Sequence, residues 1–369
     1  MRVAVLHDYL NQLGGAERVL KSILDIFPGA DVYTLLYDEQ KTCGIFRGMV
    51  KETSFLDRNW IRNRHRAFIP LAPLATRLMR SREKYDLVVS SSAGYAKGIP
   101  VDAPCHISYC HTPLRYAWEI EYLKNLPLRP SPLGNTILRP AAWMVARWLR
   151  KWDKKAAGRV NVFIANSRFI ADKIRAYYGR DAEVVYPPVR EDDFYFEPRE
   201  KQDDYYLMVG RLLYYKCFDV GISAFSAMGK KLVIIGRGPE EEKLKKIANP
   251  AFVRFISGVS DSKLRKYYTG ARALIFPQVE DFGLVAAEAQ MCGLPVLAFQ
   301  TGGGSEIVEN GKTGLLFSEQ TPSAIIGAVR EFESKKFDRH YIAQYAKKFS
   351  EDRFRKELTA AMRKAGAEV

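Results

Sequence analysis

Two glutamates, Glu280 and Glu288, lie eight positions apart in the second half of the chain, and the residues before Glu288 are apolar. Glu280 follows an apolar run typical of a buried strand, whereas Glu288 falls within a predicted helix. A carboxylate among apolar residues needs hydrogen-bond donors, such as ribose hydroxyls. The amides of Phe282 and Gly283 lie where that helix should begin and can bind a phosphate oxygen. The pattern predicts a site for a phosphorylated, hydroxyl-rich ligand.

Two basic side chains, Arg211 and Lys216, follow the apolar run 206–209. A guanidinium binds phosphate through two parallel N–H groups, and an ammonium adds a point charge. Together they could neutralise a diphosphate leaving group. Taken alone, the pair is more typical of ordinary basic residues on a surface loop.

The first half of the chain offers a glycine pair and a histidine. Gly14 and Gly15 lie between a predicted strand at 2–7 and a helical stretch, where a backbone can approach a phosphate closely. The G-x-G-x-x-G spacing of dinucleotide sites is missing, and a tight turn is an equal alternative. His111 follows a predicted strand at 106–109 and could bind a sugar hydroxyl or polarise a reacting oxygen. A purely structural role is the alternative for His111.

The elements that must position these residues alternate between short β-branched runs and helical stretches along the whole chain. This alternation predicts an α/β fold with two doubly wound, Rossmann-like domains. We expect an N-terminal domain at 1–190, a polar linker, and a C-terminal domain at 200–347. A closing helix at about 348–369 is expected to pack back on the first domain. Because ligands bind at the carboxyl ends of parallel strands, the site is expected in a cleft between two facing domains.

Composition excludes several classes of protein. The 369 residues contain 47% hydrophobic residues, which is ample for two packed cores. The five cysteines form no C-x-x-C pair, so neither a disulfide framework nor a zinc site is expected. No apolar stretch approaches the ~20 residues that cross a bilayer, and the N-terminus does not resemble a secretory signal. These observations favour a cytoplasmic protein that is soluble or peripheral on a membrane.

Positive charge is concentrated in two segments, at about 58–84 and 139–159. The first holds eight basic residues against one acidic residue, and the second holds seven against one. Both interleave these bases with tryptophan and aliphatic residues, a composition typical of a surface that meets anionic lipid. Nucleic acid is the rival partner for such patches, and a solvated face over ordinary helices is the third interpretation.

Motifs of the second half resemble those of a known enzyme family. They are the Glu280 to Glu288 motif, the run 289–296, the glycine-rich 302–306 and the segment 311–317. In this combination they resemble retaining nucleotide-sugar glycosyltransferases of the GT-B fold, in glycosyltransferase family 4. The N-terminal Gly-Gly-Ala-Glu and the Cys-His-Thr-Pro-Leu-Arg-Tyr segment are similar to bacterial O-antigen and exopolysaccharide mannosyltransferases.

The resemblance implies a role for each candidate residue. Arg211 and Lys216 would bind the donor diphosphate, Glu288 the ribose, and Glu280 the transferred sugar near its reacting carbon. His111 would face the hydroxyls of the donor sugar, and the glycine pair would form a loop close to the phosphates. Two departures, Cys217 and Asp281, stand where many relatives have glycine and leave the identity of the donor open.

The resemblance further implies a mannosyltransferase that uses GDP-mannose and a polyprenyl-diphosphate-linked saccharide on the inner face of the plasma membrane, in surface polysaccharide biosynthesis. No divalent metal is expected, because basic side chains and a helix N-terminus would neutralise the leaving group. One alternative is a hexosyltransferase with a UDP-sugar and a soluble acceptor. Alternatives from other classes are a basic nucleic-acid-binding protein and an NAD-type oxidoreductase, although the latter lacks its glycine fingerprint.

Overall fold

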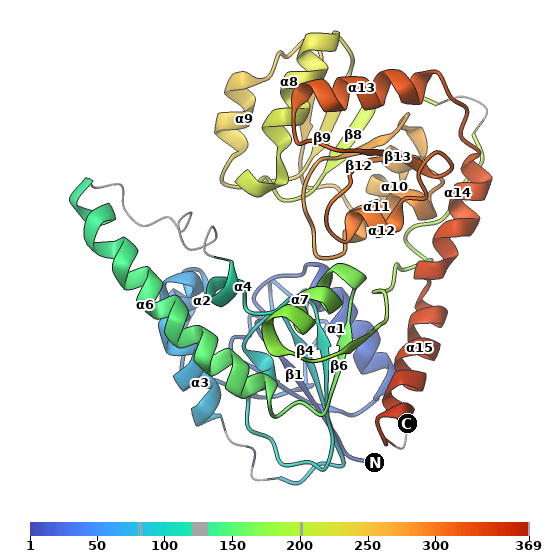
Figure 1. Cartoon of the computed structure of the whole chain (residues 1–369). Helices are drawn as coiled ribbons and strands as arrows, with labels where there is room; N and C mark the ends of the chain where they lie inside the picture. Colours follow the sequence, from blue (N-terminus) through green and yellow to red (C-terminus); the bar gives the residue numbers. More distant parts are fainter. Residues whose placement is uncertain (80, 82, 120–131, 200–201, 368–369) are drawn as a thin grey trace. The chain divides into compact units, whose positions relative to one another are not determined.

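The computed structural model describes residues 1–79, 81, 83–119, 132–199 and 202–367, with only the backbone of 132–142. The chain divides into two compact units. Unit 1 comprises Met1–Val185 and Arg355–Val369, and unit 2 comprises Tyr186–Phe354 (Figure 1). The polar segment expected as a linker belongs to unit 2, where Phe194 is buried and contacts the ring of Tyr268.

Unit 1 is built on a seven-stranded parallel sheet with the order β3-β2-β1-β4-β5-β6-β7. Its strands are β1 (Val3–His7), β2 (Asp31–Thr34), β3 (Val50–Thr53), β4 (Leu87–Ser92), β5 (His106–Cys110), β6 (Val162–Ala165) and β7 (Ala182–Val184). The central strands β1 and β4 are buried at every position, as expected when helices cover both faces of a parallel sheet.

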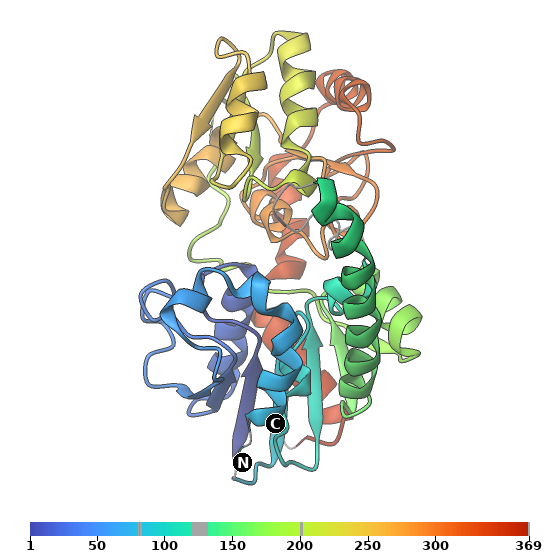
Figure 2. The ribbon, with the colours of Figure 1, turned by 90° about the vertical axis from the view of Figure 1, so that its left-hand side faces the viewer.

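Helices connect these strands in unit 1. They are α1 (Gly15–Ile26), α2 (Asn59–Arg62), η1 (His65–Leu71), α3 (Ala72–Leu78), η2 (Ala96–Gly98), α4 (Arg115–Trp118), α6 (Pro132–Ala157), α7 (Arg168–Tyr178) and the end of α15 (Glu351–Lys364). Figure 2 shows α2, α3 and α6 over one face of the sheet, where Leu6 and Val88 share a core with Ile69 and Leu149. The C-terminal segment is anchored in the same unit, because Lys364 Nζ lies 3.0 Å from Glu183 Oε1.

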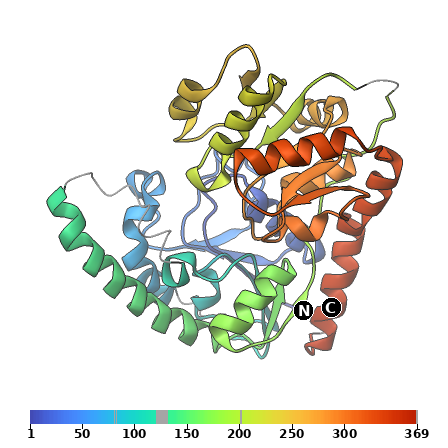
Figure 3. The same cartoon turned by 45° about the horizontal axis from the view of Figure 1, so that its top comes forward.

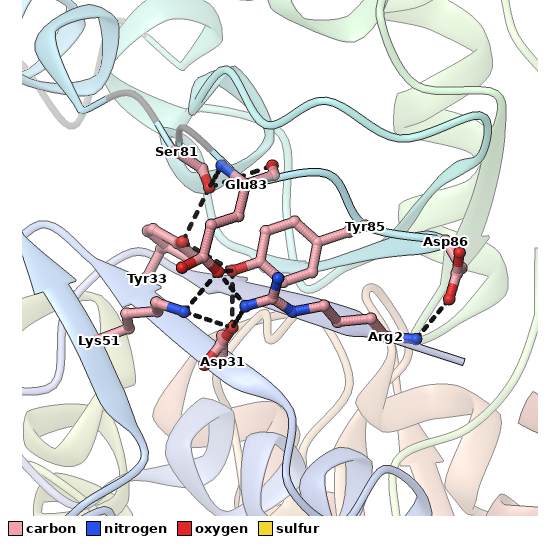
Figure 4. Close-up of polar contacts among 8 residues, drawn as sticks. All are labelled: Arg2, Asp31, Tyr33, Lys51, Ser81, Glu83, Tyr85 and Asp86. Carbon is pink, nitrogen blue, oxygen red and sulfur yellow. Dashed lines mark hydrogen bonds and ion pairs between the residues drawn. The ribbon is translucent and has the colours of Figure 1, made fainter.

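A network of charges closes the amino edge of this sheet (Figure 4). Lys51 Nζ lies 2.8 Å from Asp31 Oδ2 and 2.5 Å from Glu83 Oε2, and Arg2 contacts both carboxylates. The Tyr85 hydroxyl donates to Asp31 over 2.7 Å. Burial opposes ionisation of Asp31, yet the bonds from Lys51 and Tyr85 outweigh it and lower its pKa. The network joins β1, β2 and β3 to the segment before β4.

A buried ion pair joins the helices that cover one face of this sheet. Lys97 Nζ lies 2.6 Å from Asp153 Oδ1, and both side chains are almost fully buried. Asp153 Oδ2 also accepts hydrogen bonds from Trp118 Nε1 at 2.8 Å and from the Tyr178 hydroxyl at 2.7 Å. The carboxylate therefore joins η2, which follows β4, to α4, α6 and α7.

Unit 2 contains a six-stranded parallel sheet with the order β10-β9-β8-β11-β12-β13. Its strands are β8 (Tyr206–Val209), β9 (Leu232–Ile235), β10 (Val253–Ile256), β11 (Leu274–Phe276), β12 (Val296–Phe299) and β13 (Gly314–Phe317). The helices are η3 (Tyr214–Lys216), α8 (Phe218–Met228), α9 (Glu241–Ile247), α10 (Asp261–Gly270), α11 (Leu284–Met291), α12 (Gly304–Ile307), α13 (Pro322–Glu333), α14 (Arg339–Ala346), η4 (Lys347–Phe349) and the start of α15. Figure 3 shows α13 packed beside α8 over β12 and β13.

Both sheets confirm the expectation of two doubly wound, parallel α/β domains. Within the described residues, no helix has the length and apolar content needed to span a lipid bilayer.

Candidate functional site

A lysine and a glutamate meet at the carboxyl edge of the unit 2 sheet. Lys216 ends η3, in the loop after β8, and Glu280 lies in the loop after the adjacent strand β11. Lys216 Nζ forms an ion pair with Glu280 Oε1, and the two side chains are 14% and 19% exposed. The structure thus brings together two predicted site residues that lie 64 positions apart, and a ligand can still reach both.

Glycines of a neighbouring loop position the backbone around Arg211, whose side chain is exposed. A Cβ at Gly236 would lie 1.9 Å from the Gly210 carbonyl oxygen, and one at Gly238 would lie 2.2 Å from the Leu212 oxygen. The loop after β9 can therefore lie against the loop after β8 only because both residues are glycine. This close approach of two loops depends on tertiary structure, so the sequence pattern did not identify Gly236 or Gly238.

The loop that carries Glu280 rests on the glycine-rich segment after β12. The Gly303 amide donates to the Glu280 carbonyl over 2.8 Å. A Cβ at Gly303 would lie 2.3 Å from the Asp281 oxygen and 2.5 Å from the Phe282 Cα. In the sequence, this glycine run was visible only as part of a family resemblance. Its packing shows that it supports the loop that carries Glu280.

Phe282 and Gly283 lie immediately before α11, as predicted, but the Phe282 side chain is part of the core. Its ring contacts those of Tyr186 and Phe349, and it is 3% exposed. Gly283 caps the helix with φ of +104°, a conformation that other residues adopt only under strain. Only the backbone of these two residues is available to a phosphate.

Glu288 lies in the second turn of α11, whereas Glu280 precedes the helix. Glu288 Oε2 accepts a hydrogen bond from the Tyr268 hydroxyl over 3.2 Å, and the residue is 9% exposed. The buried carboxylate thus has a hydrogen-bond donor from α10, and no sequence motif identified Tyr268. The eight-residue spacing therefore joins a loop residue to a helical one rather than two residues on one helix.

Cys217, one of the two departures, has φ of +54° between η3 and α8. Gln320, which follows β13, contacts Cys217 Sγ at 3.3 Å and donates to the Pro277 oxygen over 2.7 Å. Burial raises the pKa of the Cys217 thiol to about 11, so the thiol stays protonated at neutral pH. Gln320 joins the loops after β8 and β11, and no sequence pattern identified it.

In unit 1, Gly14 caps the N-terminus of α1 and Gly15 is the first residue of that helix. The Gly14 amide donates to Glu17 Oε2 over 2.8 Å, and Glu17 is buried. Gln12 Nε2 lies 3.5 Å from the other carboxylate oxygen. The negative charge of Glu17 therefore already lies at the helix N-terminus where a phosphate was predicted.

His111 follows β5 at the carboxyl edge of the unit 1 sheet and is 8% exposed. Its Nε2 lies 2.8 Å from Ser91 Oγ, which lies 3.1 Å from His7 Nδ1. Burial lowers the pKa of His111 to about 4 and, with the charge of His111, lowers that of His7 to about 3. Both rings are neutral at pH 7, so each carries one N–H.

No group of three or more His, Cys, Asp or Glu side chains in the described part of the chain has the arrangement of a metal site. The charged groups at the carboxyl edge of unit 2 include Arg211, Lys216, Glu280 and Glu288. They can bind an anionic ligand that also carries hydroxyl groups.

Two family models match the two halves of the chain. Residues 13–193 match the model described as Glycosyltransferase Family 4, and residues 189–349 match Glycosyl transferases group 1. An uncharacterized glycosyltransferase of Methanocaldococcus jannaschii is 34% identical over 38% of this chain and 39% of its own length. A GDP-mannose-dependent α-(1-6)-phosphatidylinositol monomannoside mannosyltransferase of Mycobacterium tuberculosis is 26% identical over 54% of this chain and 59% of its own. The alignments therefore span 39% to 59% of these relatives.

Solved structures share the fold over the whole chain. Anabaena Alr3699/HepE in complex with UDP matches with a TM-score of 0.72 and 16% identity, over 99% of this chain and 100% of that one. Sucrose-phosphate synthase of Thermosynechococcus elongatus matches with a TM-score of 0.68 and 15% identity, over the full length of both chains.

Proposed function

Because this chain is a family 4-like glycosyltransferase of the GT-B type, we propose that it transfers a hexose from a nucleotide sugar with retention of the anomeric configuration. The observation that carries the proposal is the accessible Lys216–Glu280 pair at the carboxyl edge of unit 2. A cation and a carboxylate held side by side suit a reaction in which a diphosphate leaves a sugar carbon.

In this proposal, each charged group of unit 2 binds a different part of the donor. Arg211 and Lys216 stabilise the negative charge that grows on the departing diphosphate, and the amides of Phe282 and Gly283 can bind a phosphate oxygen. Glu280 interacts with the sugar near its reacting carbon, and Glu288 accepts hydrogen bonds from the ribose. The positive charge comes from side chains, so we propose that transfer needs no divalent metal.

His111 contributes from unit 1 in this proposal. Its neutral ring offers one donor or one acceptor to a hydroxyl of the donor sugar, since Nε2 is already engaged by Ser91. The glycine pair of α1 lies at the same edge of its sheet. Because Glu17 already caps that helix, a phosphate there must displace the carboxylate or bind beside it.

For the donor we propose GDP-mannose. The mycobacterial relative that is named for GDP-mannose-dependent transfer supports this choice. A UDP-sugar is the alternative. We propose that Cys217, whose Sγ contacts Gln320 Nε2, narrows the donor pocket beside the loop after β8.

For the acceptor we propose a polyprenyl-diphosphate-linked saccharide, reached from an anionic membrane surface on the cytoplasmic side. Trp60, Trp143 and Trp148 are 64%, 52% and 46% exposed on α2 and α6. Exposed leucines and methionine extend this apolar surface, namely Leu71, Leu74, Leu78 and Met144. Exposed tryptophan beside basic residues favours the lipid interface over nucleic acid.

Some of the basic residues expected in this surface have structural partners instead. Arg62 Nε lies 2.6 Å from Asp57 Oδ1, and Arg150 donates to the Ala117 carbonyl. The exposed bases that remain are Arg58, Arg64, Arg66, Arg77, Lys84, Arg147, Lys151, Lys154, Lys155 and Arg159. Arg80, Arg82 and the Arg139 side chain lie outside the described residues. Trp152 and Ile61, also expected in the patch, pack in the core.

A panel of donors tests the activity. The protein is incubated with GDP-mannose, UDP-glucose, UDP-galactose and UDP-N-acetylglucosamine, with and without a chelator, and product is identified by mass and anomeric configuration. We expect hydrolysis or transfer from GDP-mannose at equal rates in both conditions. Turnover of a uridine donor alone would reject mannose, and inversion or turnover of none would reject the proposed activity.

Vesicle flotation tests the membrane surface. We expect recovery with vesicles of phosphatidylglycerol and phosphatidylcholine, and loss of recovery in Arg64→Glu with Arg66→Glu. The matched control, Lys335→Glu with Lys336→Glu, makes the same charge change on exposed residues of unit 2. Equal recovery with neutral vesicles would contradict an electrostatic surface. Steeply salt-dependent binding to oligonucleotides, without binding to vesicles, would favour nucleic acid.

A further inference from the structure

Three buried side chains form a hydrogen-bonded line across adjacent strands of unit 1. His7 of β1 is in register with Ser91 of β4, and Ser91 is in register with Tyr109 of β5. His111 lies two residues beyond Tyr109, so the alternation of side chains places all three on one face of the sheet. His7 is 2% exposed, Ser91 is 0% exposed and His111 is 8% exposed.

A single hydroxyl connects the two rings, which couples their protonation. Ser91 Oγ lies 3.1 Å from His7 Nδ1 and 2.8 Å from His111 Nε2. A serine hydroxyl has one proton to donate and can accept from another N–H. Burial keeps both imidazoles neutral, as their lowered pKa values show. The hydroxyl can donate to only one of the two facing nitrogens, so at least one of them carries a proton. When the hydroxyl donates to one ring and accepts from the other, the two facing nitrogens have opposite protonation.

We propose that Ser91 and His7 are positioning residues that hold His111 in one tautomer and one ring orientation. With Nε2 engaged, Nδ1 is the nitrogen that meets the ligand, and its state decides whether His111 donates to a sugar hydroxyl or accepts from it. This role rests on the proposed function, because the ligand at His111 is the donor sugar.

The backbone around His111 supports the same fixed geometry. The His111 amide donates to the Ser92 carbonyl over 2.8 Å, and Asn166 Nδ2 donates to the His111 carbonyl over 3.0 Å. Asp8, next to His7, accepts from the amides of Tyr95 at 2.5 Å and Ala96 at 2.7 Å. These hydrogen bonds fix the main chain on both sides of His111. The imidazole ring could still rotate or change tautomer, and the bond to Ser91 restricts both.

Nitrogen-15 labelling of histidine tests the tautomer directly, because the chain has only five histidines. Two-bond proton–nitrogen correlations distinguish an Nδ1–H ring from an Nε2–H ring. We expect one tautomer of His111 in the wild type, with opposite protonation of the two nitrogens that face Ser91. In Ser91→Ala, we expect the His111 signals to move towards the average of two tautomers.

The chain supplies a matched control for this variant. Ser90, also fully buried in β4, has its Oγ 2.9 Å from His106 Nε2. Ser90→Ala removes the same kind of contact one residue away, and it should shift His106 while leaving His111 unchanged. Ser91→Thr retains the hydroxyl and should preserve the wild-type His111 spectrum, so the test survives if the alanine variant folds poorly.

Kinetics with the donor identified by the panel complete the test. We expect Ser91→Ala to lower kcat about ten-fold with little change in donor KM, as for loss of one supporting hydrogen bond, and Ser91→Thr to restore it. An unchanged His111 spectrum in Ser91→Ala, or equal protonation of both facing nitrogens, would overturn the proposal. A kcat equal to that of Ser90→Ala would overturn the positioning role even if the tautomer changes. Absence of turnover with every donor would refute the proposed function, while the spectra still decide the coupling.

Discussion

Acid should destabilise unit 1 well above the pH at which carboxylates become protonated, because His7 and His111 are buried in their neutral form. Burial lowers the pKa of His7 to about 3 and that of His111 to about 4, against ~6.5 in an unfolded chain. Between these values the unfolded state binds more protons than the folded state. Stability is therefore fully present above pH ~6.5 and falls as the pH is lowered towards 4.

The size of the effect follows from linkage. Each histidine contributes about 1.4 kcal/mol per pH unit in this window, so lowering the pH from 6.5 to 5 costs about 2 kcal/mol per residue. His7 and His111 together give about 4 kcal/mol, a large share of the ~5 to 15 kcal/mol that stabilises a typical domain. Burial also lowers the pKa of His106 to about 4, and this third histidine of unit 1 adds a similar fall that the His7 and His111 variants retain. Buried Asp8, whose pKa is raised, changes stability in the opposite direction as the pH falls. Its contribution is common to the wild type and to histidine variants.

Tryptophan fluorescence isolates unit 1, since all five tryptophans lie between Trp60 and Trp152. Urea unfolding is followed at pH 7.5, 6.5, 6.0, 5.5 and 5.0. His7→Gln and His111→Gln should each be less sensitive to pH by about 2 kcal/mol between pH 6.5 and 5. His340→Gln, at an exposed position of unit 2, is the control and should match the wild type. A wild-type free energy of unfolding that stays constant over this range would refute the reasoning, as would equal slopes in all three variants.

Four further substitutions test the remaining structural arguments. Lys216→Ala and Glu280→Ala should each lower kcat by roughly ten- to a thousand-fold, the scale for loss of one electrostatic contact to the transition state. Near-normal turnover in both variants would contradict the assigned site. Gly303→Ala places a Cβ against backbone atoms and should destabilise unit 2 by about 1–3 kcal/mol. Urea unfolding followed by circular dichroism measures this change. Gly327→Ala is the control and should not destabilise the protein, because the space around Gly327 is open. Lys97→Met leaves a buried carboxylate without its counter-ion and should cost about 3–5 kcal/mol by tryptophan fluorescence; a cost under 1 kcal/mol would contradict a buried pair.

The fold could be predicted from the sequence because strands and helices follow from local patterns of apolar and polar residues. Alternation of apolar runs and helical stretches places parallel strands, and parallel strands bring their following loops to one edge. That reasoning selected Lys216 and Glu280 separately, and the structure places them in one ion pair. Motif spacing also located Glu288 and its place on a helix, whereas its contact with Tyr268 depends on tertiary structure.

Residues that support the site could not be predicted in the same way. Ser91 and Gln320 belong to no motif, and their contacts depend on strand order and register. Gly303 was visible only as part of a glycine run, since its function lies in the closeness of another loop. Glu17 follows the glycine pair within a recognised motif, yet only the structure shows that its carboxylate binds the Gly14 amide.

The two edges of the unit 1 sheet show how a parallel fold separates stability from binding. At the amino edge, Lys51 forms ion pairs with both Asp31 and Glu83, so these opposite charges are paired with one another (Figure 4). At the carboxyl edge, His7 and His111 share one serine hydroxyl and remain uncharged. A salt-bridge network placed there would compete with a ligand for the same donors, whereas neutral groups bound to one another leave defined atoms for it. The same logic predicts that charge substitutions in the amino-edge network change stability while leaving donor KM unaltered.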